Sequence, residues 1–155
     1  MTTTINRREF MKLTGATVLC ACTGAVGFGG CTAISSAPLA PEGSYHREED
    51  WGILSLAEVE ELEAVGGVVR VPFADGPAAG VLVVHSGEDA YHAFANRCTH
   101  NGKELDYRHE KGRVQCVSGK SHFDLQGDVI KGPAEGALRS YPVQLEGDRL
   151  VIQLA

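Results

Sequence analysis

The sequence predicts an all-β domain of short antiparallel strands. Runs rich in Val, Ile, Leu, Tyr and Phe recur at intervals of about ten residues between residues 68 and 154. Polar turn sequences separate these runs, among them Ser86-Gly87-Glu88-Asp89, Gln126-Gly127-Asp128 and Glu146-Gly147-Asp148. The one segment with the apolar spacing of a helix is short. Strands and turns of this kind are typical of an antiparallel sandwich or barrel.

Residues 1–31 have the features of an export signal. Arg7-Arg8 is followed by Phe10 and Lys12 and then by an apolar stretch from Leu13 to Phe28. This arrangement resembles a twin-arginine (Tat) signal. Because the Tat route carries folded proteins, the resemblance implies that any cofactor is inserted in the cytoplasm before export.

The leader ends in Phe28-Gly29-Gly30-Cys31, which resembles a lipobox. In a lipobox two small residues precede a cysteine that is acylated and becomes the new N-terminus, so the resemblance implies a lipid tether at Cys31. Two alternatives remain open. The apolar stretch can be an uncleaved membrane anchor, although a membrane span needs about 20 apolar residues, or the chain can be cleaved near Ser35-Ser36-Ala37.

Residues 32–50 are rich in Ser, Ala, Pro and Gly and then in charge, and they have no apolar period. Such a composition is typical of a flexible linker. We therefore expect a tether over residues 32–50 and a folded domain over residues 51–155.

The charge of the chain excludes a nucleic-acid-binding surface. The net charge is −6, and the leader contributes two positive charges to it, so the remaining residues carry −8. Domains that bind nucleic acids are basic. The sequence therefore predicts no nucleic-acid partner.

A short helix is expected at the start of the domain. Ser55 and Glu58 have the spacing of a capping box, and Gly66-Gly67 follows as a stop signal. The apolar face of this helix would contain Leu56, Val59 and Leu62. The predicted strands that follow are Val68–Phe73, Gly80–Val84, Tyr91–Ala95, Gly112–Val117, His122–Leu125, Val129–Lys131, Ser140–Leu145 and Arg149–Leu154.

Cysteine and histidine recur in two short segments of the domain and predict a metal site. Cys98 and His100 stand two residues apart, and Cys116 and His122 stand six apart. The other three cysteines lie in the leader, so Cys98 and Cys116 are the only thiols of the domain. Thiolates and imidazoles are ligands of both zinc and iron–sulfur centres.

The region around these residues resembles the Rieske family. The first loop of that family, Cys-x-His-x-Gly, is matched by Cys98, His100 and Gly102. The second loop, Cys-x-x-His-Gly-Ser-x-Phe/Tyr-Asp, is matched by Cys116, Ser121, Phe123 and Asp124. Gly119 stands where the family has its second histidine ligand, and Lys120 stands where it has a glycine.

The resemblance covers the chain from about Leu54 to Leu154 and implies stacked antiparallel sheets with a small cluster-binding subdomain. In that family a hairpin turn corresponds to Asp124 to Gly127, and Gly132-Pro133-Ala134 covers the cluster loops. Lys103 and Ser118 stand where respiratory Rieske proteins have two further cysteines. No disulfide would link the two loops, which packing and hydrogen bonds must then hold.

The implied cofactor is a 2Fe-2S cluster with Cys98 and Cys116 on the inner iron and His100 on the outer iron. His122 is the first candidate for the fourth ligand. It stands beside Phe123, a predicted core residue, and neighbours on a strand face opposite sides, so His122 points away unless the loop is remodelled. The other candidates are water and the side chains of Ser118, Lys120 and Asp124.

The resemblance also concerns the hydrogen bonds to the cluster. By resemblance the Ser121 hydroxyl would bond a bridging sulfide, whereas Phe123 replaces a tyrosine donor. The loss of this donor implies a reduction potential below the respiratory range. His85, His92 and His109 have polar neighbours and are expected on the surface.

The resemblance implies a membrane-tethered electron-transfer protein outside the cytoplasm, or the small subunit of a respiratory or periplasmic oxidoreductase, for example an arsenite-oxidase-like enzyme. Its partner would be a redox protein or a large oxidoreductase subunit. It would not be an enzyme alone, because the sequence offers no substrate pocket, nucleophile or second metal beside the cluster. The missing histidine at Gly119 leaves two alternatives open: a cluster-free binding or structural module of an envelope complex, and a mononuclear zinc site.

Overall fold

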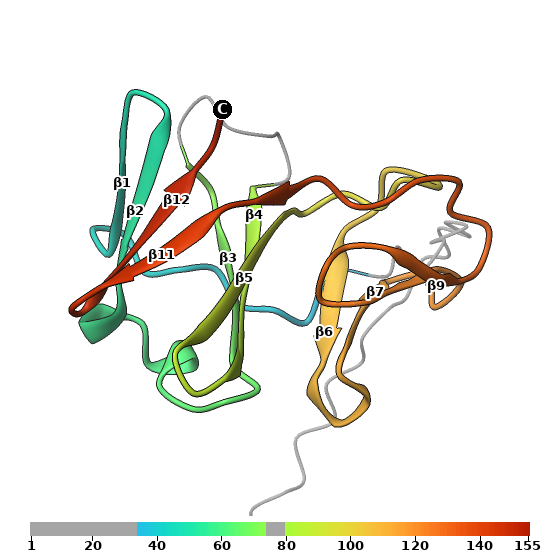
Figure 1. Ribbon diagram of the computed structural model, residues 1–155, viewed down its shortest axis with the longest axis horizontal. Coiled ribbons are helices and arrows are strands. Elements are labelled where there is room, and N and C mark those ends of the chain that lie inside the picture. The colour runs from blue at the N-terminus through green and yellow to red at the C-terminus, as the bar shows by residue number, and fades with distance from the viewer. Residues whose placement is uncertain (1–33, 74–79) are drawn as a thin grey trace, which may run out of the picture. The chain divides into compact units, whose positions relative to one another are not determined.

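Three four-stranded antiparallel sheets form the folded part of the chain (Figure 1). The computed structural model describes residues 34–73 and 80–155, which belong to one compact unit. The prediction of an all-β fold of antiparallel sheets is confirmed. The predicted leader lies outside the described residues.

Strands that are distant in the sequence are neighbours in the first two sheets, whereas the third sheet follows the order of the chain. In spatial order, the first sheet contains β1 (Tyr45–Glu48), β2 (Trp51–Ser55), β12 (Arg149–Gln153) and β11 (Val143–Glu146). The second contains β10 (Ser140–Tyr141), β5 (Ala90–Ala95), β4 (Val81–Gly87) and β3 (Val68–Val71). The third, called the small sheet below, contains β6 (Leu105–Arg108), β7 (Arg113–Cys116), β8 (His122–Phe123) and β9 (Val129–Lys131).

Strand β4 lies between two hydrophobic cores. Its side chains alternate, so Val81 and Val83 face the core shared with the first sheet, and Leu82 and Val84 face the core shared with the small sheet. All four are fully buried, as expected of a continuous apolar run that is covered on both faces. The small sheet, which contains Cys116, is thereby packed onto the rest of the domain.

The predicted helix is instead two 3-10 turns, η1 (Leu56–Glu58) and η2 (Glu60–Leu62). The Ser55 side chain makes no capping hydrogen bond, and Val59 between the turns has a non-helical backbone (φ −124°, ψ 83°). Apolar residues at intervals of three fit the three residues per turn of a 3-10 helix, so Val59 and Leu62 both enter the core. In residues 34–73 and 80–155 no helix is long and apolar enough to cross a membrane.

Residues 35–50, which we expected to belong to a flexible tether, are folded against the domain. The backbone N–H of Ala40 donates to the carbonyl of Arg70 (2.9 Å), and the N–H of Arg70 donates to the carbonyl of Pro38 (2.7 Å). Farther along, β1 pairs with β2, and Figure 1 shows the segment before it passing β3. Folding begins before the predicted boundary because backbone pairing with a strand edge requires no apolar pattern.

Each predicted strand is present; Val129–Lys131 has the predicted ends, and the other strands are shifted at one end or both. Pro142 divides the predicted strand 140–145 into β10 and β11, because proline has no N–H to donate to the ladder. The sequence does not predict β1, β2 or β6. Two of these, β1 (Tyr-His-Arg-Glu) and β6 (Leu-Asp-Tyr-Arg), carry charged residues on short strands and lack the apolar runs on which the prediction was based.

Candidate metal centre

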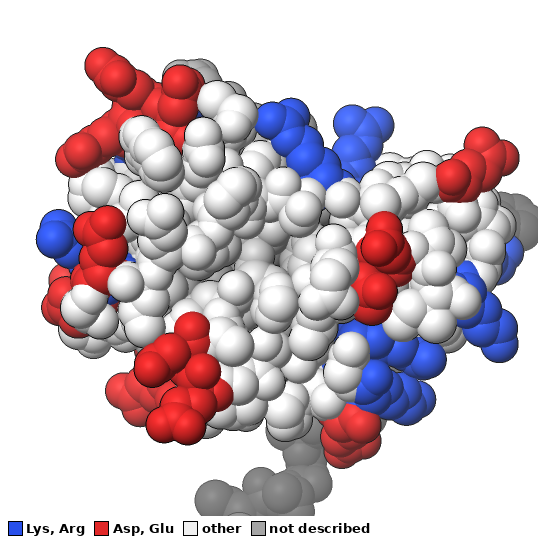
Figure 2. Space-filling model, viewed as in Figure 1, with Lys and Arg blue, Asp and Glu red and all other residues white. Residues whose placement is uncertain are grey.

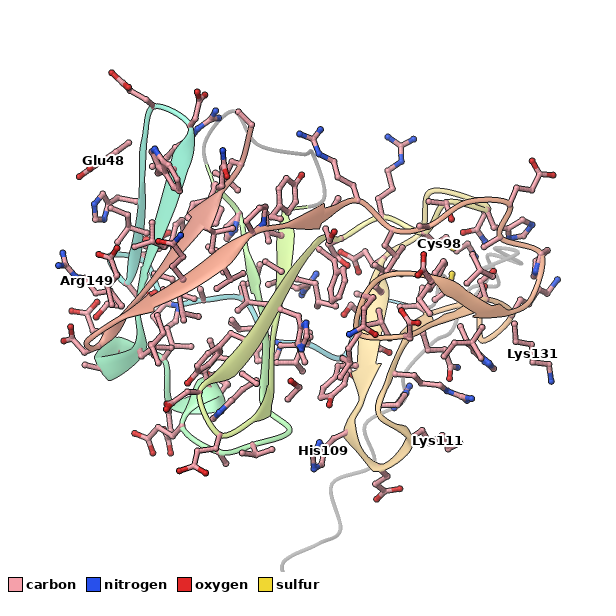
Figure 3. The ribbon with its side chains drawn as sticks, in the orientation of Figure 1. Glu48, Cys98, His109, Lys111, Lys131 and Arg149 are labelled. Carbon is pink, nitrogen blue, oxygen red and sulfur yellow. The ribbon has the colours of Figure 1, made fainter. Side chains whose placement is uncertain are left out.

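The two cysteine-containing loops lie at one end of the small sheet. The first loop (residues 97–104) leads into β6, and the second loop (residues 117–121) connects β7 to β8. The register pairs Leu105 with Cys116, so the two loops leave adjacent strands at the same end of the sheet. Figure 3 labels Cys98 in this region.

The first loop is held by backbone and side-chain hydrogen bonds. The Cys98 N–H donates to the Lys103 carbonyl (2.7 Å), and the Gly102 N–H donates to the Cys98 carbonyl (2.9 Å). The Thr99 hydroxyl donates to the carbonyl of Gly136 (2.7 Å), which ties this loop to the chain two residues after the Gly132-Pro133-Ala134 segment. These bonds shape the loop without the disulfide of the respiratory proteins, as the sequence implied.

Asn96 contributes to this loop in a way that sequence reasoning missed. Its side chain is fully buried, and its Oδ1 accepts a hydrogen bond from the Leu105 N–H (2.8 Å). The bond joins the residue before the loop to the first residue after it. The only signal in the sequence is an asparagine just before Arg97-Cys98, which has no pattern of its own.

The second loop turns at Gly119. The Gly119 N–H donates to the Cys116 carbonyl (2.7 Å), and the Cys116 N–H donates to the Ser121 carbonyl (2.9 Å). Gly119 has φ +73°, in the left-handed region that favours glycine. Gly132 packs on this loop so closely that a Cβ there would lie 2.7 Å from Cα of Ser121, so the Gly-Pro segment covers the loop.

The thiols of Cys98 and Cys116 meet in the core beneath the loops. Both cysteines are free, their exposed fractions are 2% and 0%, and they pack in one hydrophobic cluster with Leu105, Val114 and Phe123. Burial raises the pKa of the Cys98 thiol, and the nearby Cys116 thiol raises it further. The Cys98 thiol therefore remains protonated unless a positive charge, such as a metal ion, is placed beside it.

Hydrogen-bond donors also surround the two sulfur atoms. The backbone N–H groups of His100 and Asn101 point to the Cys98 sulfur and act against burial by lowering the pKa of this thiol. The Ser118 hydroxyl donates to Sγ of Cys116 (3.1 Å). These donors would stabilise thiolates, which are the form that binds metal.

Ser121 faces the same side of the small sheet as Cys116. The two residues are joined by their backbone hydrogen bond, and Phe123, two residues beyond Ser121, lies in the same core as the thiols. Ser121 is fully buried, and its hydroxyl has no hydrogen-bond partner among the described residues. A buried hydroxyl without a partner is costly unless another group accepts its proton.

His122 lies on the opposite face. It pairs with Gln115, whereas Phe123 pairs with Val114, whose side chain lies on the thiol side. Its exposed fraction is 9%, and its Nδ1 has no partner in the described part of the chain. Burial lowers the pKa of His122, and the positive charge of Arg113 lowers it further. His122 is a neutral residue of the outer face, and the structure does not bring it to the thiols.

The last two positions of the predicted ligand set are His100, on the first loop, and Gly119, which stands where the family has its second histidine. His100 is exposed on the first loop and borders a cleft of about 610 Å³. At Gly119 a Cβ would lie 3.6 Å from Nε2 of Gln115. Because Gln115 is paired with His122, a side chain at residue 119 would point to the outer face.

The described residues contain no group of three or more His, Cys, Asp and Glu side chains placed to hold a metal ion. The structure therefore does not gather Cys98, His100, Cys116 and His122 into one site. The thiol pair, its donors and the unpartnered hydroxyl of Ser121 fit the inner half of a 2Fe-2S cluster. On the outer half only His100 is available, and no second imidazole of the described residues faces it.

The three histidines that we expected on the surface differ in burial. His85, expected on the surface, is buried, because its Nδ1 bonds the Leu62 carbonyl (2.9 Å) and its ring stacks on Tyr91 (centroids 4.4 Å apart). His92 is half-buried, with Nε2 placed 2.9 Å from the Ser86 hydroxyl. His109 is exposed, as expected.

A family model for the Rieske 2Fe-2S domain matches residues 53–142. The ferredoxin component of a naphthalene 1,2-dioxygenase system from Pseudomonas aeruginosa is 29% identical over 110 residues, which are 69% of this chain and 98% of the relative. The iron-sulfur subunit of a cytochrome b6-f complex from Chlorobaculum thiosulfatiphilum is 30% identical over 107 residues, 64% of this chain and 57% of the relative.

A solved structure agrees with the fold. The ferredoxin of carbazole 1,9a-dioxygenase from Nocardioides aromaticivorans IC177 superposes with a TM-score of 0.54 and is 20% identical. The alignment covers 66% of this chain and 95% of that one. At this identity the likeness supports the arrangement of the sheets alone.

Proposed function

The chain belongs to the Rieske 2Fe-2S domain family, and on this premise we propose that it is a one-electron carrier whose cluster is held by Cys98, Cys116 and His100. When bound, such a cluster takes up and releases one electron at a potential set by its ligands and their hydrogen bonds. The chain is a carrier and not an enzyme alone.

The observation that carries this proposal is the paired burial of the Cys98 and Cys116 thiols below the two loops. Structural cysteines need no donors, yet backbone N–H groups point to the Cys98 sulfur and a hydroxyl bonds the Cys116 sulfur. Ser121 adds a buried hydroxyl without an acceptor among the described residues on the same face. Donors gathered around two thiols fit the negative charge of thiolates and sulfide.

We assign no second histidine ligand to the outer iron, for a geometric reason. A side chain at residue 119 would point toward Gln115, and His122 pairs with that same residue on the outer face. Among the described residues, His100 alone would then be a ligand of the outer iron. Replacing a neutral imidazole changes the charge of the centre and hence its potential.

The carrier works at the outer face of the cytoplasmic membrane and is tethered there. Arg7-Arg8 supports Tat export, and Cys31 supports acylation. Because Ser35 already contacts the domain, residues 32–34 are too few to form a long flexible linker between Cys31 and the domain. Its partner is another redox protein or a large oxidoreductase subunit, as expected of a chain related to a dioxygenase ferredoxin and a cytochrome-complex subunit.

The proposal is tested by the iron and acid-labile sulfide content of the full-length protein purified without oxygen. We expect about two of each per chain, and an EPR signal that appears on reduction. Zinc is measured in the same sample, because two cysteines and a histidine also suit a zinc ion. Protein with full zinc occupancy and no sulfide would overturn the proposal.

A second function is favoured by Gly119 itself. The loop is well formed around a glycine that supplies no ligand, with Lys120 rather than a glycine after it. A cluster-free Rieske-like module of an envelope complex would have this sequence. Such a protein would contain neither iron nor sulfide after anaerobic purification and would still show a β-sheet circular dichroism spectrum.

A further inference from the structure

Charge is distributed unevenly between the two parts of the domain. Residues 97–139, which contain the small sheet and both loops, carry eight Lys and Arg and six Asp and Glu. The other described residues carry three Lys and Arg and twelve Asp and Glu. Figure 2 shows this asymmetry: acidic side chains predominate over β1, β2, β11 and β12, and basic ones gather toward the small sheet.

Several carboxylates of residues 97–139 are occupied by internal contacts. Glu104 pairs with Arg70 (2.8 Å), and Asp106 is buried, where it accepts hydrogen bonds from Ser35 and Ser36. Asp124 accepts from two backbone N–H groups of the hairpin turn, those of residues 126 and 128. These carboxylates are therefore not free to neutralise the basic side chains near the loops.

Four exposed cations remain beside the two loops, and we call them the basic rim: Arg97, Lys103, Lys120 and Arg139. None of them makes an ion pair with a described residue. Glu135 is the exposed carboxylate of the segment that covers the loops. The rim therefore retains a net positive charge close to the thiols.

Arg97 and Arg139 line the cleft of about 610 Å³ that Cys98 and His100 also border. The Arg139 guanidinium is held in place, because it donates to the Leu154 carbonyl (3.3 Å) and lies over the Tyr141 ring at 5.1 Å. A guanidinium with a fixed position loses little entropy on binding and suits the planar geometry of a carboxylate. The cleft is thus suited to receive an acidic side chain.

We propose that the basic rim is the docking surface for an acidic redox partner protein, with a partner carboxylate bound between Arg97 and Arg139. This inference rests on the proposed function and specifies the partner class. Docking here brings the partner to the loop that carries exposed His100, which is the open side of the thiol site. The acidic remainder of the domain repels the same partner, so the charge asymmetry orients the encounter.

A protein fits the rim better than an anionic membrane does. Two of the four cations, Arg97 and Arg139, line a recess that the first loop and Tyr141 also border, so these two do not lie on a flat face. A recess accepts a single projecting side chain, whereas lipid headgroups contact cations on an even surface. The rim is also not a nucleic-acid footprint, because the carboxylates of the rest of the domain leave the chain acidic.

The test uses a hexaglutamate peptide as the probe and the ¹⁵N-labelled full-length protein. We expect peptide-induced NMR shifts at the amides of residues 97–102 and 139, and weaker binding as salt is raised. Arg97→Glu with Arg139→Glu should weaken binding about tenfold. The matched control is Arg149→Glu with Arg47→Glu, which reverses two charges on the first sheet and should leave the affinity for the peptide unchanged.

Two results would overturn the proposal. If the control substitutions reduce the affinity for hexaglutamate as strongly as the rim substitutions do, binding follows the net charge of the protein and no local docking surface exists. If hexalysine binds the wild-type protein as well as hexaglutamate does, the rim has no preference for an acidic partner. Circular dichroism of each variant checks the fold. The measurement requires no iron, so a cluster-free protein would fail the function test while this test could still succeed.

Discussion

Cys116 and His122 lie on opposite faces of the small sheet, because His122 pairs with Gln115 and not with Cys116. The two residues stand six apart in the sequence and on neighbouring strands, yet their side chains point away from each other. This relationship separates the thiol site from the histidine that the sequence offered as its fourth ligand.

Metal content should therefore depend on the cysteines and not on His122. We expect Cys98→Ser and Cys116→Ser to lose the visible absorbance and bound iron, because they are the only thiolates of the domain. His122→Asn should keep the iron content of the wild type. Iron loss in His122→Asn, with an unchanged circular dichroism spectrum, would show that the loop rearranges to use this imidazole.

Gly119→His should not restore the family site by itself. Its φ of +73° makes any other residue costly by about 1 kcal/mol, and the new side chain would point to Gln115. Gly119→Ala is the matched control, because it has the same backbone cost without an imidazole. Urea unfolding should show similar losses of stability for both.

The double variant Gly119→His with Lys120→Gly should behave differently. A glycine at residue 120 lets the left-handed turn move by one residue, which frees residue 119 to face the thiols. We expect more bound iron than in the single variant and the EPR spectrum of a Rieske centre after reduction. Equal iron content in the single and double variants would mean that the turn does not move.

Ser121→Ala tests whether the unpartnered hydroxyl faces the cofactor. In iron-free protein this change should not reduce the free energy of unfolding, because no hydrogen bond to a described residue is lost. Ser35→Ala is the control, since its hydroxyl bonds the Leu105 carbonyl and Asp106, and it should cost about 1 kcal/mol. In iron-loaded protein Ser121→Ala should lower the reduction potential; an unchanged potential would exclude contact with the cluster.

The free energy of unfolding should decrease as the pH is lowered, and part of this decrease should come from His122. Burial lowers its pKa below the ordinary value of 6.5, so near that pH the unfolded chain binds a proton that the folded protein does not. The stability contributed by the neutral ring is complete above about pH 7 and is lost as the pH falls toward the folded pKa. His92, whose pKa is also lowered by burial, adds to the effect.

Urea unfolding at about pH 7.5 and about pH 5.5 measures this dependence. His122→Asn should lose less stability between these two pH values than the wild type does. His46→Asn, on exposed strand β1, is the control and should match the wild type. If His122→Asn loses as much stability between the two pH values as the wild type does, other groups cause the loss of stability at low pH.

Export should require the twin arginines. Replacing Arg7 and Arg8 by lysine should block the Tat route, because this receptor distinguishes arginine from lysine at equal charge. Cys31→Ser should release a soluble form if Cys31 is acylated. Cell fractionation and immunoblotting follow both variants, and normal delivery of the double lysine variant to the envelope would refute the Tat assignment.

Much of the fold could be predicted from the sequence because its signals are local. Turn sequences and apolar runs located nine of the twelve strands in the described residues, and the spacing of Cys98, His100 and Cys116 identified the two loops. The absence of further cysteines correctly indicated loops held by hydrogen bonds. Each of these features depends on residues close to one another in the chain.

Other features depend on which strands meet, and the sequence does not contain that information locally. The tether-like composition of residues 35–50 did not reveal its pairing with Arg70, and the polar neighbours of His85 did not reveal a ring buried against Tyr91. Alternation allowed His122 to be assigned to the face opposite Phe123, but only the pairing with Val114 and Gln115 showed which face holds the thiols. In a β-sheet a shift of one residue in register moves every side chain to the other face, so ligand geometry is decided by the tertiary pairing of strands and not by spacing along the chain.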